Sequence, residues 1–188
     1  IINNIFIFFH LENYLKRVKT YWMSYKINPN KSEQENAGYS HVKDVQKAID
    51  ITHDILKETG RKVLGPGLNV LDIGCGPGLY LKDFPSNVNL YGVDISAKMI
   101  ELAKKNNPTA NFYEGEFLPA NITQTFTLIY SVGMMMYVSR SDLRKFFDKI
   151  YNLLDKDGIL FISYSHAIAR KDLFYPDINY IQYSPALL

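Results

Sequence analysis

The residues best suited to chemistry lie in one short stretch, NVLDIGCGPG, over residues 69–78. Three glycines, Gly74, Gly76 and Gly78, occupy every second position after an apolar run that contains Asp72. Glycine adopts positive φ without strain and has no Cβ, so a turn of this kind lets a ligand lie against bare backbone. On its own the pattern also fits a plain tight turn.

A second acid strengthens the case for a ligand. Asp94 ends the next apolar run, about 20 residues after Asp72. A carboxylate at a strand tip can accept hydrogen bonds from both hydroxyls of a ribose, and such charge-assisted bonds are roughly twice as strong as neutral ones. The alternative role, an N-cap for the following helix, falls more naturally to Ser96. We therefore expect Asp94 to recognise ribose.

The spacing of the glycines argues against two nucleotide-binding motifs. The dinucleotide fingerprint needs its third glycine one residue later, where this chain has Leu79. The Gly-Lys-Ser/Thr ending of a phosphate loop is also missing. A nicotinamide-dependent oxidoreductase is thus disfavoured.

Strand and helix patterns alternate around the glycine turn. Apolar runs predict strands, and three- and four-residue spacing of apolar side chains predicts helices. Expected strands cover 69–74, 89–95, 111–116, 126–133 and 158–164, and expected helices cover 11–25, 40–59, 79–84, 96–106 and 142–154. Short strands joined by helices predict an α/β protein with a parallel, doubly wound sheet covered on both faces. A ligand then binds beyond the carboxyl ends of the strands.

Five ordered blocks, VLDIGCGPG, LYGVDIS, EGEFLP, FTLIYSVGMMMYV and LLDKDGILFIS, resemble the class I S-adenosylmethionine-dependent methyltransferases, in particular their small-molecule group. The resemblance covers roughly residues 37–165. It implies a Rossmann-like sheet of seven strands, one antiparallel, and S-adenosylmethionine as methyl donor. It also implies that the chain stops before completing the C-terminal β-hairpin. We expect an N-terminal helical cap or lid over 1–36 and the methyltransferase domain over 37–188.

The resemblance also assigns cofactor contacts. The turn would line the methionine and ribose moieties, Asp94 would bind the ribose hydroxyls, and residues after later strands would surround the adenine. The implied contacts are Tyr39, Asp72, Gly74, Cys75, Gly76, Asp94, Ile95, Met99, Glu116, Phe117 and Ser131. Cys75 serves here as a small side chain and not as a nucleophile.

The chain departs from the family pattern at two places. Glu116 stands where relatives carry the aspartate that accepts from the adenine amino group. Relatives often have an imidazole near Met136 and Tyr137, and this chain has none there. Met134 to Met136 fit either core packing or an adaptable apolar wall for a substrate. His166 and His41 are the remaining weak candidates for a base, so the catalytic residue stays unknown.

Composition bounds the remaining possibilities. The 188 residues suit one domain, and a net charge of +2 gives no reason to expect nucleic-acid binding. A single cysteine fits a reducing, cytoplasmic setting. The opening IINNIFIFFHL is too short to span a bilayer, and no metal-ligand spacing is present. We expect a small-molecule substrate, no metal, and no stable membrane insertion; a homo-oligomer stays open, as does a catalytically inactive S-adenosylmethionine-binding protein.

Overall fold

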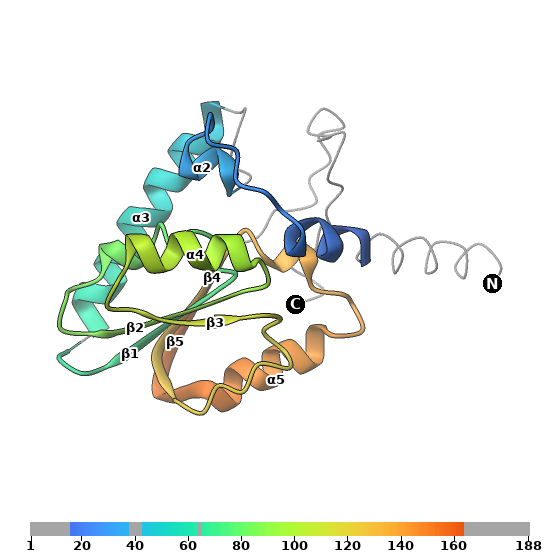
Figure 1. Ribbon diagram of the computed structural model, residues 1–188. Coiled ribbons are helices and arrows are strands. Elements are labelled where there is room, and N and C mark those ends of the chain that lie inside the picture. The colour runs from blue at the N-terminus through green and yellow to red at the C-terminus, as the bar shows by residue number, and fades with distance from the viewer. Residues whose placement is uncertain (1–15, 38–42, 64, 164–188) are drawn as a thin grey trace.

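The computed structural model describes residues 16–37, 43–63 and 65–163 (Figure 1). Several sequence predictions lie outside these residues: the contacts of Tyr39, the Ser40 cap, the candidate bases His41 and His166, and the C-terminal hairpin. None of the helices in the described part combines the length and apolar character that crossing a bilayer requires.

A five-stranded parallel sheet forms the centre of the molecule. Its strands are β1 (Asn69–Ile73), β2 (Asn89–Asp94), β3 (Asn111–Glu114), β4 (Phe126–Val132) and β5 (Leu154–Ser163), in the order β3-β2-β1-β4-β5. The predicted α/β fold with a parallel sheet is confirmed. Because the chain winds outward from β1 in both directions, the carboxyl ends of β1 and β4 meet at the switch point where ligands bind in such sheets.

Helices cover both faces of the sheet (Figure 1). Helix α3 (Lys43–Val63) and helix α4 (Ala97–Asn106) lie on one side, and helix α5 (Leu143–Leu153) lies on the other. Alternating residues of β1 divide between two cores: Val70 joins the cluster under α3, and Leu71 joins the cluster under α5. Period-2 alternation sends successive side chains to opposite faces, so both faces of β1 are buried.

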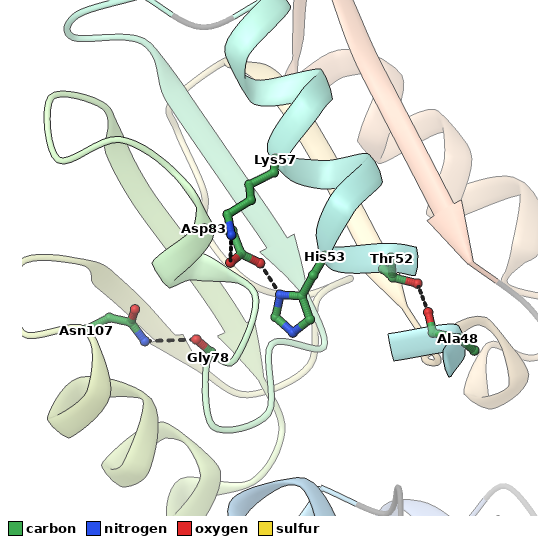
Figure 2. Close-up of polar contacts among 7 residues, drawn as sticks. All are labelled: Ala48, Thr52, His53, Lys57, Gly78, Asp83 and Asn107. Carbon is green, nitrogen blue, oxygen red and sulfur yellow. Dashed lines mark hydrogen bonds and ion pairs between the residues drawn. The ribbon is translucent and has the colours of Figure 1, made fainter. Parts of the chain in front are cut away.

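Helix α3 differs slightly from its predicted form. Helical spacing of the apolar residues predicts that Ile49, Ile55 and Leu56 share the inner face of this helix; Ile49 and Leu56 are buried, but Ile55 is exposed. The buried stripe continues through Thr52, whose hydroxyl donates to the carbonyl of Ala48 at 2.8 Å (Figure 2). Satisfying this hydroxyl within the helix allows a polar residue to occupy the inner face.

The helix predicted over 79–84 is wrong. Only a single 3-10 turn, η1 (Leu81–Asp83), forms there. Gly78 has a positive φ on one side, and Phe84 is extended before Pro85 on the other. A residue that precedes proline is pushed out of the α region, so too few residues remain for an α-helix. The two flanking residue types were visible in the sequence and could have given the answer.

The element that begins the described chain is also helical. Residues 16–23 form a helix, and α2 (Glu33–Asn36) follows it after a loop. The side chain of Asn36 is buried and holds this loop through hydrogen bonds with the backbone of Asn28, Lys31 and Ser32. Its oxygen also accepts from the hydroxyl of Tyr25 at 3.0 Å. One amide therefore fixes how the first helix is joined to α2.

Candidate cofactor-binding site

The glycine turn follows β1 directly and needs glycine at each of its three positions. Gly74, Gly76 and Gly78 have φ values of +76°, +51° and +74°. A Cβ on Gly74 would lie 2.6 Å from Cγ of Met134, and a Cβ on Gly78 would lie 2.5 Å from the side-chain nitrogen of Asn107. At Gly76 the only neighbour within 4 Å of such a Cβ, among the described residues, is the Ala37 methyl group at 3.9 Å. Gly76 is thus the place where the backbone is most open to a ligand.

Asparagines of α4 fasten the far end of the turn. The Asn107 side chain donates to the carbonyl of Gly78 at 3.0 Å (Figure 2). Asn106 donates to the carbonyl of Pro77 at 3.0 Å and also to Glu33 of α2 at 3.0 Å. The turn is therefore held from outside by side chains that the sequence did not single out.

Asp94 lies at the tip of β2, beside the turn. One carboxylate oxygen accepts from the Gly76 amide at 2.8 Å, and the other accepts from the Ser96 amide at 2.8 Å. Partial burial raises the pKa of Asp94, and these two hydrogen bonds counteract the rise. Ser96 caps α4 as predicted, since its hydroxyl accepts from the Met99 amide. Asp94 is therefore free of the capping role and is placed directly next to Gly76.

Asp72 is buried beneath the turn, with 2% of its surface exposed. Its Oδ2 atom has no hydrogen-bond partner among the described residues. Burial raises the pKa of Asp72 to about 8; the nearby Tyr130 hydroxyl lowers it, and the charge of Asp94 raises it further. Although Tyr130 lies beside Asp72, the geometry of a hydrogen bond is not met. A buried carboxyl with an unused oxygen remains at the base of the site.

Cys75 and Ser131 are both buried at the site. Burial raises the pKa of the Cys75 thiol well above its usual value, so the group is no thiolate nucleophile. The Ser131 hydroxyl, fully buried, donates to the carbonyl of Ile73 at 2.9 Å. Ser131 thereby ties the end of β4 to the end of β1. Its predicted contact with the cofactor stays a prediction, as does that of Cys75.

Three further predicted contacts, Ile95, Met99 and Phe117, lie after β2 and β3. Met99 and Phe117 are buried, and Ile95 is half-buried. Phe117 packs edge-on against Phe146 of α5, with ring centroids 5.3 Å apart. Packing thus accounts for much of the surface of Met99 and Phe117, and their role toward an adenine stays a prediction.

Glu116 is paired with the first helix. Its carboxylate lies 2.5 Å from Nζ of Lys19, and the two side chains are 43% and 46% exposed. The same helix brings Trp22 within 6.4 Å, centroid to centroid, of Tyr137 in η2 (Met135–Tyr137), just after β4. The helix over 16–23 therefore contacts loops that follow two different strands on the carboxyl side of the sheet, which the sequence alone did not show.

The three methionines after β4 have different surroundings. Met135 is fully buried in the core under α5, whereas Met134 and Met136 are half-buried. Met134 lies against Gly74. Core packing therefore describes Met135, and Met134 belongs to the wall of the turn.

The described residues contain no cluster of three or more histidine, cysteine or acidic side chains that could hold a metal. His53 of α3 instead pairs with Asp83 of η1, which also faces Lys57 at 3.9 Å (Figure 2). The His53 ring stacks against Tyr80 with centroids 4.5 Å apart. This pair joins α3 to η1 on the face of the sheet opposite α5.

The residues present suit S-adenosylmethionine. The Asp94 carboxylate at the tip of β2 matches the ribose diol. Among the described residues, only the Ala37 methyl group lies within 4 Å of a Cβ built on Gly76, and Oδ2 of Asp72, which has no hydrogen-bond partner there, matches a cationic group. The three features lie at or beneath the carboxyl ends of β1 and β2, on the edge of the sheet where ligands bind in this fold.

A parallel sheet of this order, with a glycine turn after its central strand and an acid at the neighbouring tip, defines a Rossmann-like nucleoside-binding protein. Residues 70–158 match the family model described as methyltransferase domain. The part of the chain that this model matches is a class I S-adenosylmethionine-dependent methyltransferase domain, so the resemblance in the sequence and the assignment of the methyl donor are confirmed.

Three similar proteins illustrate the range of the family. The chain is 26% identical over 165 residues to a carboxy-S-adenosyl-L-methionine synthase of Campylobacter jejuni, covering 79% of this chain and 70% of that protein. It is 28% identical over 127 residues to the 2-methyl-6-phytyl-1,4-hydroquinone methyltransferase of Synechocystis, covering 63% and 39%. The structure of magnesium protoporphyrin IX methyltransferase from Synechocystis with bound SAM matches with a TM-score of 0.63 and 18% identity, covering 92% and 81%.

Proposed function

We propose that this protein transfers the methyl group of S-adenosylmethionine to a small-molecule acceptor. The observation that carries the proposal is the Asp94 carboxylate, held at the tip of β2 against the open backbone of Gly76. In this proposal Asp94 is the ribose-binding acid, and it lies next to the position of the turn at which an added Cβ would meet the fewest atoms of the described residues. Family membership supports it.

The sulfonium of the bound cofactor supplies an electrophilic methyl group without help from the protein. The chain's own residues then have to bind, orient and exclude water, and orientation alone can contribute about 7–11 kcal/mol. In the proposal, Asp94 holds the ribose hydroxyls and Glu116 faces the adenine amino group. For this, Glu116 has to exchange its ion pair with Lys19 for the base.

The helix over 16–23 forms part of a cap on the acceptor side. Its two contacts, Lys19 with Glu116 and Trp22 with Tyr137, reach the loops after β3 and β4. Relatives whose names state a small-molecule acceptor, a hydroquinone in one case and magnesium protoporphyrin IX in the other, support an acceptor of that size.

A second candidate is an enzyme whose product is a modified cofactor. The match to the Campylobacter synthase, whose name states carboxy-S-adenosyl-L-methionine as product, covers 79% of this chain, against 63% for the hydroquinone methyltransferase. A third is a protein that binds the cofactor without turnover. Mass spectrometry distinguishes the three when the metabolite panel includes carboxylic acids as donors of the carboxyl group: the first yields S-adenosylhomocysteine and a methylated acceptor, the second a carboxylated sulfonium and a decarboxylated donor, and the third no new product.

The test begins with titration calorimetry of the purified chain against S-adenosylmethionine and NAD, followed by turnover on a metabolite panel. We expect binding of the first ligand only. Asp94→Ala should weaken that binding by about 1.5–3 kcal/mol, since hydrogen bonds to charged groups are lost. Asp148→Ala, at an exposed site on α5, is the matched control and should bind like the parent. Binding of NAD alone, or unchanged affinity in Asp94→Ala, contradicts the proposal.

A further inference from the structure

Two buried polar groups beneath the turn have no role in the function proposed so far. Asp72 of β1 and Tyr130 of β4 are neighbours in the strand register, and they are 2% and 0% exposed. Neither Oδ2 of Asp72 nor the Tyr130 hydroxyl has a hydrogen-bond partner among the described residues. Unpartnered buried polar groups are rare because each loses its bonds to water. Two of them side by side, directly under a binding site, point to a partner that arrives with the ligand.

We propose that Tyr130 is a positioning residue for the cofactor: its hydroxyl donates a hydrogen bond to Asp72 when a cationic ligand binds at the turn, and so stabilises Asp72 as a carboxylate facing that cation. This inference rests on the proposed function, because S-adenosylmethionine supplies the cation.

The reasoning follows from what burial does to a carboxyl group. Without a ligand, burial favours the protonated form of Asp72, and its pKa rises to about 8. The Tyr130 hydroxyl lowers this pKa, so it favours the carboxylate over the protonated form. A carboxylate needs a hydrogen-bond donor, and among the described residues the Tyr130 hydroxyl lies beside it in the strand register. On binding, the carboxyl proton passes to bulk solvent.

Other titratable groups of the described residues act on this pair from the turn, β2 and η1: Asp94, Cys75 and Asp83. Of the two carboxylates among them, only Asp83 has ion-pair partners within the described part of the chain, since it pairs with His53 and faces Lys57 of α3 (Figure 2). The positive or hydrogen-bonding groups of α3 already offset Asp83.

Asp94 and the neutral Cys75 thiol offer no such compensation to Asp72. The charge of Asp94 raises the pKa of Asp72, so the two acids resist ionising together. A cation bound beside both carboxylates removes that repulsion. Cofactor binding and loss of the Asp72 proton are therefore coupled, with the hydroxyl of Tyr130 fixing the carboxylate once it forms.

The experiment is calorimetric titration of the full chain with S-adenosylmethionine from pH 6 to pH 9, in pairs of buffers that differ in ionisation enthalpy. Such pairs give the number of protons released on binding. The ligand's own amino group has an ordinary pKa near 8, so Asp72→Asn supplies the reference profile. At pH 7 we expect the parent to release close to one proton more than Asp72→Asn does.

Tyr130→Phe gives the decisive comparison. Losing the donor moves the titration of Asp72 to higher pH, so the affinity should fall about tenfold at pH 7 for each pKa unit of that shift. The loss should shrink as the pH rises past the pKa of Asp72 in each protein, because a carboxyl that is already ionised has no proton to release on binding. The matched control is Tyr113→Phe on β3, which removes a hydroxyl that donates to the side chain of Gln124 at 2.8 Å. The affinity of this variant should follow that of the parent at every pH.

The outcomes separate the two proposals. A parent protein that fails to bind S-adenosylmethionine overturns the proposed function and this inference with it. A parent that binds but releases no more protons than Asp72→Asn overturns the inference alone, even where Tyr130→Phe fails to fold. A Tyr130→Phe profile that is parallel to the parent across the pH range does the same, because it indicates a purely structural role.

Discussion

Gly74 and Gly67 have the same backbone conformation, with φ of +76° at both, but different surroundings. A Cβ at Gly74 would meet the Met134 side chain at 2.6 Å, whereas no atom of the described residues lies within 4 Å of one at Gly67. Both alanine variants lose about 1–2 kcal/mol from the left-handed backbone. Gly74→Ala should lose a further amount of about 1–3 kcal/mol because Met134 is crowded.

Urea denaturation of the two variants gives this difference directly. Since the backbone term is shared, the excess loss in Gly74→Ala measures how tightly the loop after β4 packs on the turn. Equal losses would contradict the close approach of Met134. A Met134→Ala background should remove most of the excess, because the side chain that creates the clash is then gone.

At the residue scale, the sequence identified the turn and the acid at the strand tip, because both depend on local chemistry. Glycine at alternate positions indicates a turn with positive φ, and an aspartate at the end of an apolar run indicates the end of a strand. Tyr130 was missed because its significance comes from Asp72, which lies opposite it on the neighbouring strand. No pattern within β4 distinguishes the tyrosine beside Asp72 from a tyrosine in an ordinary core.

Among the elements, α5 fixes the loop that follows β3. The ammonium group of Lys149 donates to the carbonyls of Phe117, Leu118 and Ala120 at 2.6, 2.9 and 2.6 Å. It also lies 4.8 Å from the centroid of the Phe117 ring, and burial lowers its pKa. One side chain thereby holds the loop that carries Glu116, the residue expected to face the adenine.

Lys149→Met keeps the apolar stem of the side chain and removes all three hydrogen bonds. We expect a loss of about 1–3 kcal/mol in the free energy of unfolding, because three partly buried carbonyls lose a charged donor. Affinity for S-adenosylmethionine should fall as well, since the Glu116 loop is released. The matched control on the same helix is Lys145→Met, an exposed residue 3.9 Å from Asp142, which should change stability by less than about 0.5 kcal/mol. Equal effects of the two variants would show that the carbonyl contacts contribute nothing.

The helix over 16–23 can be followed optically because Trp22 is the single tryptophan of the chain. Trp22 contacts Tyr137, and Lys19 on the same helix pairs with Glu116. If Glu116 turns to the adenine, the ion pair breaks and the surroundings of Trp22 change. Its fluorescence should therefore shift on addition of S-adenosylmethionine and saturate with the calorimetric Kd.

The control for this signal is Trp22→Phe, in which the shift should disappear while cofactor binding persists. NAD should leave the emission of the parent unchanged. A saturated complex with unaltered tryptophan emission would contradict a cap that responds to the cofactor. Removal of the exposed ion pair itself, as in Lys19→Ala, should alter stability by no more than about 1 kcal/mol.

The sequence predicted elements well where period and length agree. All five strands and the helices α3, α4 and α5 form where apolar runs or helical spacing predicted them, but α3 continues to Val63 beyond its predicted end, and β5 begins at Leu154, four residues before its predicted start. The helix predicted over 79–84 was wrong because the apolar pattern was considered alone. Gly78 and Pro85 limit a helix between them to too few residues. Contacts between the first helix and the loops after β3 and β4 could not be foreseen, because they depend on how a non-adjacent element docks.

For the whole molecule, the raised pKa of Asp72 predicts a pH dependence of stability. An aspartate in the unfolded chain titrates near 3.9, whereas Asp72 in the folded protein titrates near pH 8. Between these values the folded state binds more protons than the unfolded state. The contribution of Asp72 to stability is therefore complete below about pH 4 and is lost as the pH rises toward 8, by at most about 1.4 kcal/mol per pH unit.

Asp72→Asn isolates this contribution because asparagine cannot ionise. Urea denaturation from pH 5 to pH 9 should show the parent losing stability relative to the variant as the pH rises, and the difference should level off above pH 8. Parallel curves would contradict a neutral Asp72 in the free protein. Saturating S-adenosylmethionine should flatten the decline, because the complex already contains the ionised carboxyl and has no proton left to lose. The same buried acid thus links the stability of the free fold to the charge of the ligand that the fold is proposed to bind.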